Sequence, residues 1–158
     1  MKRSRFTKLL VPVVCVLLFT ALGGSAASAA AKGTDRPWKG KGLVTLTFEP
    51  GGLIIRGEGT VNVTHLGRSH YSNVVTCEPL GCNASGGSTV VTITAANGDM
   101  VFGLGEVAPM GGGTTVTLNG GTGRFAGATG QYVVGGPPPV FTADGVFLEF
   151  TQTGTINY

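Results

Sequence analysis

The chain has 158 residues and a formal net charge of +3 at pH 7, from 11 Lys and Arg residues against eight Asp and Glu residues. Four of the basic residues lie within positions 2–8, so the rest of the chain contains seven basic and eight acidic residues. This balance excludes the clustered Lys and Arg side chains on which nucleic-acid binding depends.

Residues 1–29 are predicted to be a secretory signal peptide, and residues 30–158 a single domain. Basic residues precede an apolar run at 9–22, which is shorter than the roughly 20 apolar residues that span a bilayer. Small residues follow, and cleavage is expected after Ala29 or after Ala31. We therefore expect a secreted, extracellular protein, free or associated with the cell envelope, with no integral membrane segment after cleavage.

Two cysteines remain beyond the signal peptide, Cys77 and Cys82, in the stretch "CEPLGC". In an oxidising compartment, this short spacing around a proline and a glycine predicts a disulfide that constrains a loop. A metal-binding pair is the alternative, but no second Cys/His pair at ligand spacing accompanies it.

Strand patterns dominate the sequence after residue 32. Thr, Val, Ile and Phe alternate with Gly or polar residues, and helical periodicity is almost absent. Asn97-Gly98 predicts a tight hairpin, because a type I′ turn needs positive φ at both central residues. The predicted strands are, in chain order, 43–48, 54–65, 69–76, 88–95, 99–107, 114–118, 125–134 and 145–156. The segment 135–144, with three consecutive prolines, is expected to be an extended, polyproline-like loop.

Eight short antiparallel strands predict an all-β fold, an eight-stranded up-and-down β-barrel in which no edge strand stays unpaired. A two-sheet β-sandwich is the alternative. Glycines within the predicted strands favour the barrel, because tight curvature is easier for residues that lack a Cβ atom. With eight strands, the interior is filled by side chains or holds one small ligand.

The stretch "NGGTGRFAGATG" at 119–130 raises the question of a phosphate-binding loop. The dinucleotide fingerprint requires a helix after its glycines, and the P-loop requires a Lys followed by Ser or Thr. Neither is present, since the sequence continues with β character. We interpret 119–121 as a turn, Phe125 as a return to the barrel interior, and Gly127 and Gly130 as sites of close strand approach.

Four segments also carry a family resemblance: "THLGR" at 64–68, "AANGD" at 95–99, "GGTGRFAGATG" at 120–130 and "GTI" at 154–156. In this order they resemble bacterial proteins with an allene oxide cyclase-like barrel, which are distantly similar to plant dirigent proteins. The resemblance covers about residues 57–156. It implies an eight-stranded barrel and a homo-oligomer, a trimer in the plant relatives. It assigns no catalytic residue to this chain.

Strand alternation supplies candidates for a functional site. In 54–65, His65 shares its parity with apolar and glycine positions, so it is predicted to face the interior. In 99–107, Glu106 shares a face with Met100, Phe102 and Leu104. A carboxylate at the end of an apolar row is costly unless it is paired or near the rim.

These faces suggest a pocket at one barrel mouth with His65, Glu106, Arg68 and Arg124 as its polar groups. A His and a Glu beside an apolar cavity are suited to general acid–base chemistry. The favoured alternative is structural: His65 binds a backbone carbonyl, Glu106 pairs with an arginine, and both arginines satisfy carbonyls at turns.

The sequence favours a non-catalytic barrel that binds a small apolar ligand. An isomerase or cyclase like the plant relatives and a cell-envelope structural protein remain as alternatives. No cofactor or metal is expected. His65 and His70 are five residues apart, a spacing that on a single strand would put them on opposite faces, which makes them a poor metal pair.

Overall fold

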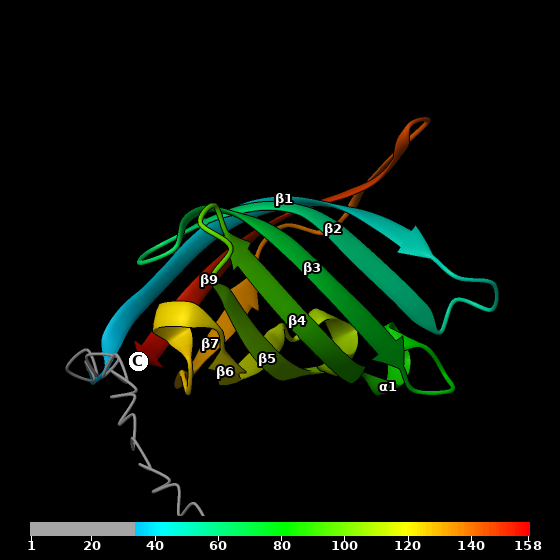
Figure 1. The fold of residues 1–158 in the computed structure, drawn as a ribbon. Helices are drawn as coiled ribbons and strands as arrows, with labels where there is room; N and C mark the ends of the chain where they lie inside the picture. Colours follow the sequence, from blue (N-terminus) through cyan, green and yellow to red (C-terminus); the bar gives the residue numbers. More distant parts are fainter. Residues whose placement is uncertain (1–33) are drawn as a thin grey trace, which may run out of the picture.

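The computed structural model describes residues 34–158, which form a closed antiparallel β-barrel (Figure 1). The predicted signal peptide lies outside the described residues. The strands are β1 (Arg36–Phe48), β2 (Ile54–Val63), β3 (Gly67–Cys77), β4 (Gly87–Ala95), β5 (Met100–Val107), β6 (Thr114–Gly121), β7 (Thr129–Gly135), β8 (Val140–Thr142) and β9 (Gly145–Asn157). The short helices are α1 (Cys82–Ser85), η1 (Pro109–Gly111) and η2 (Gly123–Phe125).

The pairing of β1 with β9 closes the barrel. β1 pairs with β2 on one side and with β9 on the other, in a register that runs from Arg36↔Ile156 to Leu46↔Val146. The remaining barrel strands follow in chain order, and each pairs antiparallel with its neighbour. The predicted eight-stranded barrel is confirmed, and the sandwich alternative is wrong.

The largest differences between the structure and the predicted elements are in three places. β1 begins at Arg36 rather than at residue 43, because Gly40 and Gly42 continue its pairing with β9. The segment 123–125 is the 3₁₀ turn η2, and β7 begins only at Thr129. The expected extended loop at 135–144 contains β8, which pairs with the first residues of β9 beyond the barrel.

One end of the barrel, which we call the closed end, is formed by the turns 64–66 and 96–99 and by the segment 122–128. Phe125 and Ala128 of this segment are fully buried. Below them, the Trp38 ring stacks on Tyr132 with centroids 5.3 Å apart. Large aromatic side chains therefore fill this half of the barrel.

The opposite end, which we call the open end, is formed by the loops 49–53, 78–86, 108–113 and 136–144. The hairpin of β8 and the start of β9 projects from this end beyond the barrel wall (Figure 1). The inward side chains of this half are mostly smaller, which leaves the interior incompletely filled.

Close strand approach requires glycine at position 59. A Cβ atom there would overlap the backbone carbonyl oxygen of Leu43, across the β1–β2 pairing. Gly135 is a suitable comparison, because its Cβ would meet only Thr151 Oγ1 at 3.9 Å.

We predict that Gly59→Ala destabilises the fold by about 1–3 kcal/mol, the usual cost of overpacking. Gly135→Ala should change stability by less than about 0.5 kcal/mol. Urea unfolding followed by circular dichroism measures both, and equal midpoints for the two variants would contradict the prediction.

Candidate functional site

The open half of the barrel contains a cavity of about 190 Å³. Its walls come from the inward faces of most strands and from the start of α1. The lining residues are Val44, Leu46, Ile55, Tyr71, Asn73, Val75, Cys82, Thr89, Val107, Thr114, Val134, Leu148 and Phe150. Most of this lining is aliphatic or aromatic, which makes the cavity apolar.

The cavity continues into a wider hollow of about 670 Å³ at the open end. The two spaces share Val107, Val134, Leu148 and Phe150 among their lining residues. The outer hollow is also lined by the prolines at 137–139. The outer hollow, which we call the mouth, therefore adjoins the inner cavity on the side of the open end.

Several exposed apolar side chains lie on the loops of the open end and on the projecting hairpin. Leu53, Leu80 and Met110 lie on three different loops of the open end, and Val140 and Phe141 lie on the projecting hairpin.

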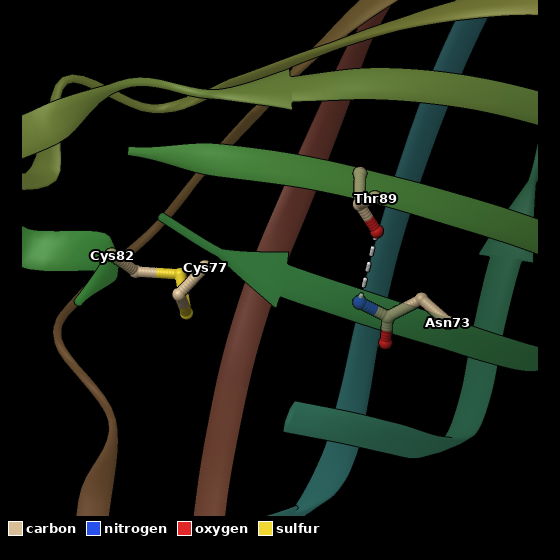
Figure 2. The surroundings of a disulfide bond; sticks show 4 residues. All are labelled: Asn73, Cys77, Cys82 and Thr89. Atoms are coloured by element: carbon tan, nitrogen blue, oxygen red, sulfur yellow. Dashed lines mark hydrogen bonds between the residues drawn. A yellow bond between two sulfur atoms is a disulfide. The ribbon is translucent and has the colours of Figure 1, made fainter. Parts of the chain in front are cut away.

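The predicted disulfide between Cys77 and Cys82 is confirmed. It joins the last residue of β3 to the first residue of α1 and so fixes the loop 78–81 (Figure 2). Cys82 lines both the inner cavity and the outer hollow. The disulfide therefore holds one side of the mouth in place.

The cavity also contains neutral polar groups, chiefly on β3. Asn73 Nδ2 donates a long hydrogen bond of 3.5 Å to Thr89 Oγ1 on β4 (Figure 2). Asn73 Oδ1 is buried and has no hydrogen-bond partner within the described residues. Burial raises the pKa of the Tyr71 hydroxyl, which keeps it protonated and able to donate.

The structure brings two of the four predicted site residues together, at the closed end. His65 lies in the turn after β2 with φ of 73°, which interrupts the strand alternation. Its Nε2 lies 3.1 Å from the Pro37 carbonyl oxygen. Arg124 donates to the His65 carbonyl oxygen at 2.6 Å and pairs with Asp99 at 3.5 Å. Both residues therefore contact backbone carbonyl groups at turns, as the structural alternative expected.

Glu106 and Arg68 lie elsewhere, on the outer surface of the barrel. Arg68 is exposed on β3 opposite Asn62 of β2. Glu106 is exposed on β5, opposite Ser88 of β4. The four predicted residues therefore do not form one pocket, and none of them lines the inner cavity.

The prediction for β5 placed its faces the wrong way round. Met100, Phe102, Leu104 and Glu106 do share a face, but the inward row is Val101, Gly103, Gly105 and Val107. Two of these inward positions are glycine, where a Cβ on Gly103 would lie 2.6 Å from Val116 Cγ1. The outward row of β5 therefore contains more large apolar residues than the inward row. The inward row has glycines because the Val116 side chain occupies the space beside them.

The segments that carry the family resemblance gather at the closed end. The backbone N–H of Met100 donates to Thr122 Oγ1 at 2.9 Å. Gly123 has φ of 56°, and a Cβ there would overlap the Asp99 carboxylate. Together with the Arg124 contacts, these interactions hold η2 and the buried Phe125 over this end of the barrel.

Sequence reasoning did not select Tyr71, Asn73 or Thr89. The same period-two alternation contains the signal, because Ser69, Tyr71 and Asn73 share one parity in the predicted third strand. That row was less noticeable because it mixes polar and apolar residues.

The chain matches no model of a known protein family and no curated protein sequence. Within residues 34–158, no helix has the length and apolar character needed to cross a bilayer. The same residues contain no group of three or more His, Cys, Asp or Glu side chains arranged to hold a metal ion.

We predict that Arg124→Ala lowers the free energy of unfolding by about 1–3 kcal/mol, through the loss of a charge-assisted hydrogen bond. Arg68→Ala is the matched control and should change it by less than about 0.5 kcal/mol. Thermal and urea unfolding measure both, and a neutral Arg124→Ala would show that η2 does not depend on this contact.

We also predict that stability falls as pH rises above about 10, the ordinary pKa of tyrosine. Burial raises the pKa of Tyr71, and burial with a smaller effect of Tyr71 raises that of Tyr132. Unfolded chains therefore release these protons first, and each group contributes up to about 1.4 kcal/mol per pH unit until its folded-state pKa is passed.

Urea unfolding between neutral and strongly alkaline pH measures this loss. Tyr71→Phe and Tyr132→Phe should each make the dependence less steep. Tyr158→Phe is the comparison variant, since Tyr158 is only partly buried. Unchanged slopes in the first two variants would contradict the assignment.

Proposed function

We propose that this protein is a secreted carrier or sensor that binds a small apolar molecule inside the barrel. The observation that carries the proposal is the apolar cavity that continues into the mouth. Dry apolar cavities of roughly 150 Å³ are known to bind molecules such as benzene. At about 190 Å³ the inner cavity is large enough for a ligand of this class.

The chemistry of the lining supports binding through shape and burial. Its polar groups, Tyr71, Asn73, Thr89 and Thr114, are neutral. Exposed apolar side chains on the loops of the open end, such as Leu80 and Met110, are available for a first contact with an apolar ligand. The Cys77–Cys82 disulfide supports an oxidising, extracellular location, since such bonds persist outside the cytosol.

A second candidate is an isomerase or cyclase of the allene oxide cyclase-like kind. It is favoured by the hydrogen-bonding groups of Tyr71 and Asn73 in the same confined cavity. A confined cavity accelerates a reaction of one bound molecule by restricting its conformation, which requires no strong acid or base. Conversion of a bound ligand, detected by mass spectrometry, would distinguish this candidate from a simple binder.

We predict that Val134→Phe weakens the binding of toluene at least about tenfold, because the larger side chain occupies the cavity. Val133→Phe is the matched control, because Val133 is the neighbouring residue on the outer face and is 51% exposed. Binding is measured by nuclear magnetic resonance titration of methyl signals, and circular dichroism checks that both variants fold.

Val75→Phe fills the same cavity from β3 and is used if Val134→Phe fails to fold. Equal toluene affinity in the wild type, a folded cavity-filling variant and the control would show that the ligand does not bind in this cavity. No toluene binding by the wild type would remove the proposal itself.

A further inference from the structure

The wall of the cavity contains a buried side-chain oxygen that has no hydrogen-bond partner. Among the described residues, the side-chain atoms that are buried without a partner are Asn73 Oδ1, Tyr132 Oη and Gln152 Nε2. Tyr132 and Gln152 do not line the cavity, whereas Asn73 does. Unpaired buried polar groups are costly, so Asn73 Oδ1 calls for an explanation.

The Asn73 amide lies between the two strands that flank β3. On the β4 side, Nδ2 donates to Thr89 Oγ1 over 3.5 Å, which is longer than an ordinary hydrogen bond (Figure 2). On the β2 side, Gly57 pairs with Asn73, and a Cβ on Gly57 would overlap Asn73 Oδ1. The oxygen thus occupies space that a side chain at position 57 would otherwise take. Neither end of the amide is held by a strong hydrogen bond.

The lining of the cavity is uncharged. Its other polar groups include the hydroxyls of Tyr71, Thr89 and Thr114, and the rest is mostly aliphatic or aromatic. No Lys, Arg, His, Asp or Glu side chain from the described part of the chain lines it. An ion buried without a partner is strongly unfavourable, so a ligand of this cavity is neutral.

We propose that the cavity selects a neutral apolar molecule that carries one hydroxyl group, an alcohol. The ligand O–H donates to Asn73 Oδ1, and the hydrocarbon body contacts aliphatic residues such as Leu46 and Leu148. The last torsion of an asparagine side chain has broad preferences, so a rotation of the amide turns Oδ1 from Gly57 towards the ligand. This inference rests on the proposed function and adds the chemical class of the ligand.

A hydroxyl group meets two conditions that other polar groups do not meet together. A ketone or ester oxygen has lone pairs but no proton to donate, so Asn73 Oδ1 would stay unpaired beside it. A protonated amine can donate, but it brings an uncompensated charge into an uncharged lining. An alcohol is neutral and donates one proton.

The test compares cyclohexanol with methylcyclohexane, which has a methyl group in place of the hydroxyl. We expect Asn73→Leu, which removes the acceptor and keeps a similar size, to weaken cyclohexanol binding about three- to tenfold, the value of one hydrogen bond. Methylcyclohexane affinity should stay within about twofold, because no hydrogen bond to it is lost. Calorimetry or nuclear magnetic resonance titration measures both affinities.

Asn62→Leu is the matched control, since it makes the same substitution at an exposed position of β2 that does not line the cavity. It should leave both affinities unchanged. Circular dichroism checks folding, and Asn73→Val takes the place of Asn73→Leu if that variant does not fold. Methylcyclohexane binding by the variant also shows that its cavity is still open.

Cyclohexanone distinguishes a ligand that donates a proton from one that is merely polar. Its oxygen accepts hydrogen bonds and cannot donate one. Asn73→Leu should therefore change cyclohexanone affinity by less than about twofold. A loss as large as that of cyclohexanol would overturn the assignment of Asn73 Oδ1 as the acceptor.

The outcomes separate the two proposals. If neither cyclohexanol nor methylcyclohexane binds the wild type, the proposed function fails. If both bind and Asn73→Leu weakens them equally, or weakens neither, ligand binding stands and the role of Asn73 Oδ1 is overturned. If methylcyclohexane binds and cyclohexanol does not, the preference for a hydroxyl group is overturned as well.

Discussion

Hydrogen bonding between β1 and β9 is the constraint on which the rest of the structure depends. It joins residues a hundred or more positions apart and turns a sheet with two edges into a closed wall. Closure places alternate residues of every strand in one interior. The sizes of these side chains decide which parts of the interior are filled and which stay empty. Trp38, Tyr132 and Phe125 fill the half near the closed end. Smaller residues in the other half leave the cavity, so the site is a consequence of how side-chain volume is distributed along the barrel.

The two ends of the barrel have different chemistry. At the closed end, Arg124, Asp99 and the His65 carbonyl oxygen hold η2 over the interior. At the open end, the loops carry exposed apolar side chains, and the Cys77–Cys82 disulfide constrains one of these loops, 78–81. The segments 64–68, 95–99, 120–130 and 154–156, which the sequence analysis singled out, are concentrated at the closed end. They shut the barrel and contribute no residue to the cavity lining.

The barrel was predictable from sequence because alternation, turn residues and in-strand glycines all indicated curved antiparallel strands. The disulfide followed from the short spacing of Cys77 and Cys82. The pocket was harder to predict, since the titratable residues chosen as candidates lie at turns, as His65 and Arg124 do, or on the outer face, as Arg68 and Glu106 do. On β5, two inward positions are glycine because the Val116 side chain from β6 occupies the space beside them. The inward face therefore could not be recognised from its apolar residues. Asn73 was missed because a single amide beside valines forms no recognisable sequence motif. What distinguishes it is that its buried Oδ1 atom has no hydrogen-bond partner within the described residues, which only the structure shows.

The pairing of Arg36 with Ile156 places both ends of the described chain side by side at the closed end (Figure 1). Anything joined to Tyr158 therefore leaves the molecule on the side away from the open end. A surface anchor or affinity handle attached there would orient the barrel with its open end towards the solution. The same proximity of the ends makes the barrel a natural candidate for circular permutation, with the old ends linked and new ones opened in a surface turn.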